Sequence, residues 1–255
     1  LSLETDGAPQ ALQAEPVSKE KFVANVVHVD IVQGDSVSLI KYVAVVSSLY
    51  AEKATIQATA QASAAAAQTK GFENMLSEQR AAWAKKWAEC DITIDGDVAA
   101  QQAIRFNILQ MNQTYTGEDE RLNIGPKGFT GEKYGGVTYW DTEAYCLPFY
   151  LKTADPKVAR QLLVYRYKHL GRAIENAAKL GFKHGAALYP MVTINGEECH
   201  NEWEITFEEI HRNGAMSFAI YNYINHTGDV GYLAEYGLEV LIAISRFWRQ
   251  RVQWS

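Results

Sequence analysis

A short segment in the middle of the sequence brings aromatic rings and carboxylates together. Residues 135–150 read GGVTYWDTEAYCLPFY, so Trp140, Asp141 and Glu143 directly follow a glycine-rich run. An aromatic ring can cover the apolar C–H face of a pyranose while carboxylates accept hydrogen bonds from its hydroxyl groups. The structural alternative is that Asp141 caps a helix and Trp140 packs against the core. The pattern predicts a site for a neutral sugar and leaves that alternative open.

A second segment repeats this combination of side chains. Residues 195–211 read NGEECHNEWEITFEEIH and contain six glutamates, two histidines and Trp203. Taken one by one, most of these carboxylates fit surface or capping positions. A metal site is disfavoured, because the spacing matches no HExxH pattern and Cys199 has no CxxC partner. The segment therefore predicts a second aromatic-and-carboxylate set.

A glycine-rich stretch before the first segment does not indicate a nucleotide cofactor. Residues 125–136 read GPKGFTGEKYGG, and Thr130 stands where a phosphate-binding loop requires its second glycine. The sequence also contains no GxSxG motif for a nucleophilic serine. We therefore expect a flexible pocket wall here, and neither a cofactor nor a metal.

Composition limits the class of partner. The chain has 255 residues, of which 47% are hydrophobic, and a formal net charge of -6. No basic block with interleaved aromatics occurs, which disfavours nucleic acid and anionic membranes as partners. Three distant cysteines, Cys90, Cys146 and Cys199, suggest no disulfide framework, and no signal peptide or membrane-length apolar run is evident. These features predict a cytoplasmic protein that binds a small uncharged molecule or a second copy of itself.

The elements that must position both segments are mainly helical. Residues 21–32 and 36–46 are rich in Val and Ile around the turn-like QGDS, which predicts the last hairpin of a β domain. From Ala51 to about Ala88 the composition favours helix, with a break at Gly71. Asp97, Asp155 and Asp229 are expected to cap later helices. These helices are predicted at 98–115, about 141–152, 156–181, about 207–226, and from 229 onward.

The connections between these helices alternate in length. Those at 116–140 and 181–206 are long, whereas those at 153–155 and 227–228 are short. In a ring of antiparallel helices every second connection lies on the same face, so both long loops should meet at one end. The predicted fold is a helical toroid, and its five helices are too few to close a double ring. We therefore expect a chain cut from a longer protein.

Three segments carry a resemblance to a known family. YGGVTYWDTEAY, RFNILQMNQTY and ALYPMVTINGEECHNEWEITFEEIHRNGAMSFAIYNYINHTGD closely resemble the inverting disaccharide phosphorylases of glycoside hydrolase family 65. The resemblance implies a mainly α fold with a β N-terminal portion. Residues 1–50 would end an N-terminal β-sandwich, 51–94 would form a helical linker, and 95–255 would begin an (α/α)6 catalytic barrel.

The resemblance also implies a reaction. Family members of this kind cleave a disaccharide with inorganic phosphate, here maltose, to give glucose and β-glucose 1-phosphate with inversion. An inverting hydrolase needs a base to activate water, whereas phosphate arrives as an anionic nucleophile and makes the base dispensable. Phosphate is a co-substrate and no cofactor is expected. The general acid, a glutamate, is expected beyond Ser255, so no catalytic residue is assigned here, and the full-length enzyme is expected to be a homodimer.

The resemblance places sugar recognition on the two segments. Trp140 and Asp141 match the glucose-binding motif, with Glu143 beside them, and residues 200–208 match the loop associated with the choice of acceptor sugar. The candidate residues of that loop are His200, Asn201, Glu202, Trp203, Glu204 and Glu208. Many trehalose- and kojibiose-specific relatives have an aromatic residue after Tyr-Pro, where this chain has Met191, so we expect an α-1,4 linkage.

Other functions stay open at this point. Another α-glucobiose, such as trehalose, kojibiose or nigerose, could replace maltose as the substrate. A hydrolase with a similar barrel would act without phosphate. The chain could also be a non-catalytic sugar-binding fragment.

Overall fold

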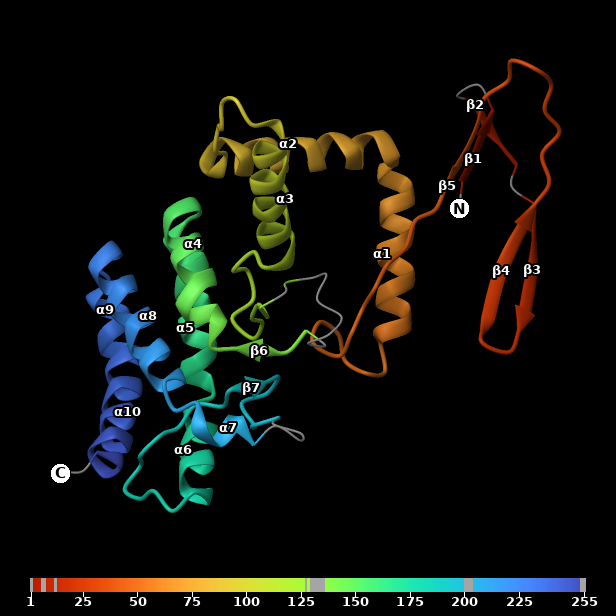
Figure 1. Ribbon diagram of the computed structural model, residues 1–255. Coiled ribbons are helices and arrows are strands. Elements are labelled where there is room, and N and C mark those ends of the chain that lie inside the picture. The colour runs from red at the N-terminus through yellow and green to blue at the C-terminus, as the bar shows by residue number, and fades with distance from the viewer. Residues whose placement is uncertain are drawn as a thin grey trace. The chain divides into compact units, whose positions relative to one another are not determined.

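The chain divides into two units, residues 1–85 and 86–255. A computed structural model describes residues 2–5, 8–11, 13–126, 128, 136–199 and 204–252 (Figure 1). The first unit carries strands β1 to β5, and the second consists of helices joined by loops, with two strands of two residues each. The predicted fold class, mainly α with a β N-terminal portion, is confirmed.

The strands of the first unit form two small antiparallel sheets. In one, β1 (Ser2–Thr5) pairs with β2 (Ala8–Gln10) and with β5 (Val37–Ile40). In the other, β3 (Ala14–Lys19) pairs with β4 (Phe22–Val27). Figure 1 shows β3 and β4 as a separate ribbon of two strands.

The predicted hairpin of residues 21–32 and 36–46 is wrong, because β4 and β5 belong to different sheets. The turn itself forms, since the Asp35 N–H donates to the Val32 carbonyl at 3.1 Å and the Asp35 carboxylate accepts from the Val32 N–H at 2.9 Å. β4 pairs with β3 and β5 pairs with β1, and both partner strands lie earlier in the chain. β5 therefore pairs with β1, which is far from it in the sequence, and not with the neighbouring β4 as predicted.

Two helices follow the sheets, as the alanine-rich composition predicts. Helix α1 (Ile56–Lys70) and helix α2 (Phe72–Cys90) are separated by Gly71, which has a φ of +81°. That conformation is strained for other residues, so the predicted break at this glycine is confirmed.

The second unit contains most of the helices, and three of them begin at an aspartate that caps the helix N-terminus. Its α-helices are α3 (Val98–Thr114), α4 (Leu147–Thr153), α5 (Pro156–Lys168), α6 (Leu170–Lys179), α7 (Ile205–Glu208), α8 (Arg212–Thr227), α9 (Val230–Tyr232) and α10 (Leu238–Arg251). Residues Thr142–Cys146 and Leu233–Gly237 are π-helical turns that lead into α4 and α10. The carboxylates of Asp97, Asp155 and Asp229 accept backbone N–H bonds at 2.9, 2.8 and 2.9 Å, which confirms the three predicted caps.

Two predicted helices differ from the structure. The helix expected over 156–181 is interrupted at His169, and the helix expected from about 207 begins at Arg212, after the short separate helix α7. At His169 the second long loop packs against the chain: a Cβ added to Gly196 would lie 3.0 Å from the His169 ring. A tertiary contact therefore accompanies the interruption, which lies two residues before Gly171.

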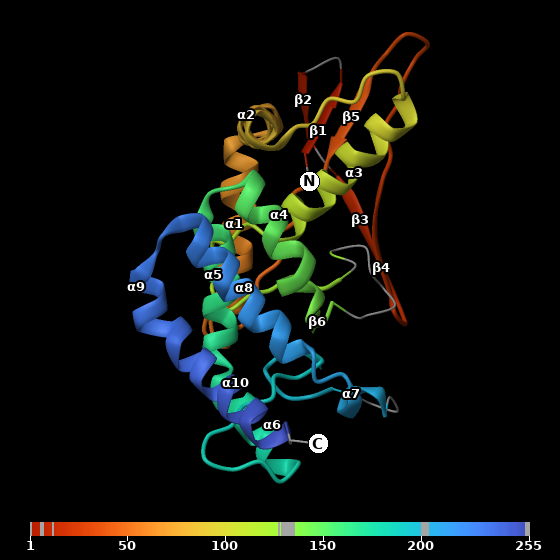
Figure 2. The same ribbon diagram turned by 60° about the vertical axis from the view of Figure 1, so that its left-hand side comes forward.

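The core of the second unit lies among four helices. Helices α4, α5, α8 and α10 lie together in Figures 1 and 2. They bury side chains that include Leu147, Tyr150, Leu162, Ala219 and Ala243. Each buried leucine contributes about 1.5–3 kcal/mol to folding relative to an exposed one. This core fixes the helix ends from which the loops emerge.

The long connections meet at one end of the helices, as predicted. Strand β6 (Thr138–Tyr139) on the first long loop pairs antiparallel with β7 (Val192–Thr193) on the second. The short turns meet at the other end, where Lys152 Nζ lies 3.2 Å from His226 Nδ1. The two segments singled out in the sequence therefore share one end of this unit.

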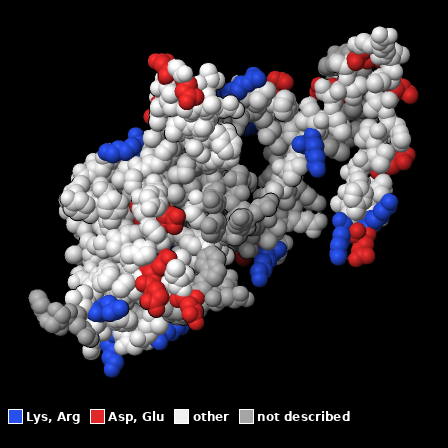
Figure 3. Space-filling model, viewed as in Figure 1, with Lys and Arg blue, Asp and Glu red and all other residues white. Residues whose placement is uncertain are grey.

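Charged side chains do not gather on the face drawn in Figure 3. Small groups of Lys and Arg side chains lie among small groups of Asp and Glu side chains, and at several places the two adjoin. Among the residues that the structure describes, the side chains drawn on this face form no extended basic area.

Candidate functional site

The two long loops are joined around a small apolar cluster. Tyr139, Met191 and Val192 are buried together, and Trp140 and Cys199 pack against them. The β6–β7 ladder places Tyr139 directly opposite Val192. Trp140, the next residue after β6, is thereby held beside the second loop.

Trp140 is supported from the side by other aromatic rings. The His211 ring meets it edge-on, with centroids 4.8 Å apart and an interplanar angle of 90°. Tyr145 lies 6.0 Å away at 44°, and 66% of its surface is exposed. Trp140 itself is only partly buried. This geometry suits an aromatic platform for the apolar face of a sugar.

Asp141 lies at the helix start but does not serve as a side-chain cap. Its carboxylate makes no capping hydrogen bond within the described residues, and the N–H groups of residues 143 and 144 donate to the Trp140 carbonyl, both at 3.1 Å. Burial raises the pKa of the half-buried Asp141 carboxyl, and nearby Glu209 raises it further. A carboxylate held beside a tryptophan in this way can accept a hydrogen bond from a ligand hydroxyl.

Glu143 is engaged inside the fold. It is 0% exposed, and its two oxygens accept from Arg166 Nε at 2.7 Å and Arg166 Nη2 at 2.8 Å. Burial raises the pKa of the Glu143 carboxyl, and the Arg166 guanidinium opposes that shift. Arg166 Nη2 also donates to the Tyr139 carbonyl at 2.9 Å. This pair ties α5 to the strand that precedes Trp140, and in this conformation Glu143 offers no surface to a sugar.

The acceptor-loop candidates are only partly visible. Glu204 and Glu208 are exposed and lie just before α7 and at its last residue. His200, Asn201, Glu202 and Trp203 lie outside the described residues. The described edges of this loop are Cys199 on one side and Glu204 on the other.

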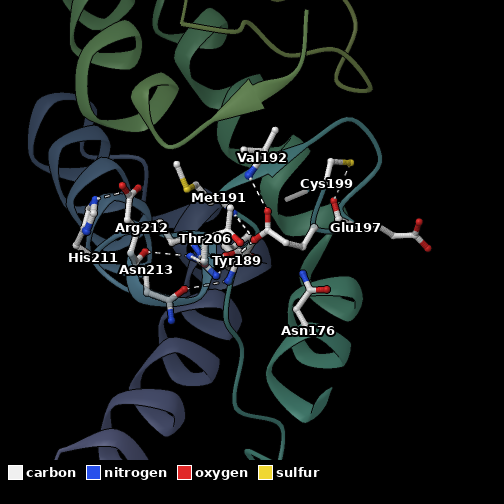
Figure 4. A network of polar contacts seen from close by, with 12 residues as sticks. Asn176, Tyr189, Met191, Val192, Glu197, Cys199, Thr206, His211, Arg212 and Asn213 are labelled. Atoms are coloured by element: carbon white, nitrogen blue, oxygen red, sulfur yellow. Dashed lines mark hydrogen bonds and ion pairs between the residues drawn. The ribbon is translucent and has the colours of Figure 1, made fainter. Parts of the chain in front are cut away.

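Sequence reasoning missed the polar network under this loop (Figure 4). Glu198 accepts from the Met191 and Val192 N–H groups at 2.7 and 3.0 Å, and it lies 3.5 Å from Arg212 Nη2. Arg212 also donates to the carbonyls of Tyr189 and Thr206. Glu198 was one of six similar glutamates and Arg212 one residue of a helical pattern, so neither stood out. The contact of His211 with Trp140 was equally invisible in the sequence.

The described residues contain neither a cluster of metal-binding side chains nor a helix of membrane-spanning length and hydrophobicity. No three His, Cys, Asp or Glu side chains there lie close enough to hold a metal ion together. None of the helices there is long and apolar enough to span a lipid bilayer.

Comparison with family models assigns both units. Residues 105–255 match the model of the glycosyl hydrolase family 65 central catalytic domain, and residues 1–86 match that of the N-terminal domain of the same family. The chain belongs to glycosyl hydrolase family 65. The resemblance seen in the sequence is thereby confirmed.

Relatives within family 65 include several phosphorylases. The chain is 62% identical over 185 residues to maltose phosphorylase of Bacillus subtilis. That alignment covers 72% of this chain and 24% of the relative. It is 36% identical over 230 residues to alpha,alpha-trehalose phosphorylase of Thermoanaerobacter brockii. That alignment covers 90% of this chain and 29% of the relative. The matched part of the chain thus spans 24% and 29% of the length of these two relatives.

A solved structure agrees with the fold. It is described as a candidate kojibiose phosphorylase from the human microbiome and superposes with a TM-score of 0.75 at 33% identity. The match covers 80% of this chain and 27% of that one.

Proposed function

We propose that this family 65 chain is part of a maltose phosphorylase that converts maltose and inorganic phosphate into glucose and β-glucose 1-phosphate. The observation that carries the proposal is the 62% identity to maltose phosphorylase of Bacillus subtilis. Trehalose and kojibiose phosphorylases are similar at 36% and 34% identity. The larger identity favours the α-1,4-linked substrate over the other two.

The site geometry supports a sugar at the meeting point of the two loops. In the proposal, the Trp140 ring covers one face of the glucosyl unit that becomes β-glucose 1-phosphate, and Asp141 accepts hydrogen bonds from its hydroxyls. The buried Glu143 acts through Arg166 by fixing the Tyr139 carbonyl, 2.9 Å from that guanidinium. The loop of residues 200–208 contacts the second glucose.

The proposed reaction is a single displacement. A phosphate oxygen bonds to the anomeric carbon from one face while the bond from that carbon to the leaving glucose oxygen breaks on the other. A carboxylic acid donates the proton that the leaving oxygen needs. We place that acid and the phosphate site in a longer polypeptide that carries these 255 residues. Phosphate is a co-substrate, and the reaction needs no other cofactor.

The wider architecture belongs to the same proposal. Residues 95–255 would supply the first helices of an (α/α)6 barrel, 51–94 a linker, and 1–50 the end of a β-sandwich. The full-length protein would be a cytoplasmic homodimer.

The test is glucose release by the full-length protein with and without inorganic phosphate. Maltose, trehalose, kojibiose and nigerose are supplied in parallel, and the anomer of glucose 1-phosphate is read by NMR. The proposal expects phosphate-dependent release from maltose and formation of the β-anomer. Release without phosphate would indicate a hydrolase, and faster release from another disaccharide would indicate a different linkage. The same assay on the 255 residues alone asks whether they are only a sugar-binding fragment.

A further inference from the structure

A cavity of about 210 Å³ lies between helix α6 and the start of helix α8. Its volume corresponds to about seven water molecules at about 30 Å³ each. Neither Trp140 nor Asp141 is among the described residues that line it. The lining includes Asn176, Lys179 and Leu180 at the end of α6, Leu188 and Glu198 in the second long loop, and Arg212 at the start of α8. The cavity therefore has room for a small organic molecule and does not use the proposed sugar platform.

The buried guanidinium of Arg212 is one wall of this cavity. The side chain is 3% exposed, and Nε and Nη1 donate to the carbonyls of Tyr189, Thr206 and Glu209. Nη2 makes no hydrogen bond to another side chain or carbonyl of the described residues. Its ion-pair contact with Glu198 Oε2 is 3.5 Å long, whereas a charge-assisted hydrogen bond is typically about 2.7–2.9 Å. Nη2 can therefore donate to a molecule in the cavity.

Glu198 neutralises this guanidinium only in part. Its two oxygens accept the N–H groups of Met191 and Val192 at 2.7 and 3.0 Å, so the loop backbone shares its charge. Burial lowers the pKa of the Arg212 guanidinium, and neighbouring carboxylates oppose that shift. Lys179 is exposed and adds a second cation to the lining. The described charged residues of the lining are thus two cations and one carboxylate, which favours a ligand with a single negative charge.

Apolar side chains form another part of the lining. Leu188 is 1% exposed, whereas Leu180 is 44% exposed. Asn176 is buried, and its Nδ2 donates to the Gly196 carbonyl at 3.3 Å. Figure 4 shows this amide directed from α6 toward the polar network. The cavity therefore joins an ionic end to an apolar end within a small volume.

We propose that this cavity binds a small carboxylate ion with a short branched aliphatic body. The carboxylate accepts hydrogen bonds from Arg212 Nη2, because a guanidinium matches the planar geometry of a carboxylate. The aliphatic body contacts Leu180 and Leu188 and loses its exposure to water. The site does not depend on the proposed function, since it uses neither Trp140 nor Asp141.

The experiment titrates the full-length protein with 3-methylbutanoate and follows the ligand signals by NMR. We expect a Kd of about 0.1–1 mM, which a ligand of about seven non-hydrogen atoms can reach. 3-Methylbutan-1-ol has the same branched body without the charge, and acetate and inorganic phosphate have the charge without that body. Each should bind about tenfold more weakly or worse. Valine adds an ammonium group beside the two cations and should also bind more weakly.

Substitutions in the lining locate the bound carboxylate. Leu180→Glu places a like charge at an exposed position and should raise the Kd of 3-methylbutanoate by about tenfold or more. Lys179→Gln should raise it about threefold. Arg212→Lys keeps the charge but loses the forked donors, so the Kd should also rise. Glu175→Gln on the same helix is the matched control, because that glutamate makes an exposed pair with Arg172 at 2.8 Å, and it should change the Kd less than about twofold.

Several results would overturn the proposal. Absence of binding to the wild-type protein would do so directly. Equal binding of 3-methylbutan-1-ol would indicate a purely apolar cavity, and tighter binding of phosphate or valine would indicate another class of ligand. An unchanged Kd in Leu180→Glu, or loss of binding in Trp140→Ala, would place the carboxylate at another site.

Two of the variants change exposed side chains, so the test does not depend on a fragile substitution. Lys179→Gln and Leu180→Glu decide the outcome even if Arg212→Lys fails to fold. The titration contains no maltose and measures no turnover. Failure of the proposed function would therefore leave the expected Kd values unchanged, and failure of the carboxylate site would leave the proposed function untouched.

Discussion

Replacing Glu143 by Gln should destabilise the helical unit strongly, because it leaves the buried guanidinium of Arg166 without its counter-charge. Both side chains are almost fully inaccessible, at 0% and 3% exposure, and they are joined by bonds of 2.7 and 2.8 Å. Breaking a buried ion pair by removing one partner costs about 3–5 kcal/mol. An exposed pair typically contributes about 0–1 kcal/mol.

The expected loss is large enough for a thermal melt. For a unit of the size of residues 86–255, about 2–4 °C of melting temperature corresponds to each kcal/mol. Glu143→Gln should therefore lower the melting temperature of the full-length protein's catalytic domain by about 6–20 °C. All variants are scanned at the same rate, because unfolding of large proteins is often irreversible. Glu175→Gln serves as the exposed control and should melt within about 2–4 °C of the wild type.

A double variant separates stability from positioning. Glu143→Leu with Arg166→Met replaces the pair by apolar side chains, which often restores stability. It also removes the donor to the Tyr139 carbonyl, so KM for β-glucose 1-phosphate should stay raised after the melting temperature recovers. A melting temperature for Glu143→Gln within 2 °C of the Glu175→Gln value would refute the reasoning about the buried pair.

Three further predictions concern other parts of the structure. Burial and neighbouring arginines lower the pKa of His169 from 6.5 to about 4, so the folded state favours the neutral ring. The contribution of the neutral His169 ring to the free energy of unfolding is therefore fully present above pH 6.5, and about 1–2 kcal/mol of it is lost as the pH drops toward 4. His169→Gln should flatten that part of the profile of melting temperature against pH. Gly117→Ala should destabilise more than Gly136→Ala in urea unfolding: both have a φ of +72°, but only at Gly117 would the new Cβ lie 2.6 Å from Val158 Cα. Trp140→Ala should raise KM for β-glucose 1-phosphate about 10–100-fold in steady-state kinetics through loss of stacking, and an unchanged KM would contradict the sugar platform.

Local signals in the sequence predicted local structure well. The caps at Asp97, Asp155 and Asp229 form because each carboxylate reaches an N–H group only two or three residues ahead. Gly71 separates α1 from α2 because its backbone conformation suits glycine. The meeting of the two long loops followed from the alternation of connection lengths, which is a property of the chain order alone.

Contacts between distant residues were beyond those signals. Pairing of β5 with β1 spans more than thirty positions, and the periodicity of either strand does not encode it. The partner of Glu143 lies 23 residues away, in a helix whose pattern gives no reason to single out Arg166. The carboxylate of Glu143 was therefore assigned to a sugar in the sequence, whereas the structure shows it bound to a guanidinium.

The same holds for the second loop. Glu198 differs from its five neighbouring glutamates only in where the backbone places it, next to two N–H groups of β7. No residue-type rule separates it from Glu204 or Glu208, which are exposed. The sequence could identify the loop but not the side chain that anchors it.

The ladder between β6 and β7 has a consequence for transplanting loops between relatives. It pairs Thr138 with Thr193 and Tyr139 with Val192 through main-chain groups, so this part of the docking does not depend on side-chain identity, in contrast to the apolar cluster around Tyr139 and Met191. A segment exchanged between Ile194 and Ile205 would inherit the same attachment if its glutamate at position 198 is kept. An exchange that keeps Glu198 and the two strands would therefore leave this attachment, and the helices that carry it, unchanged.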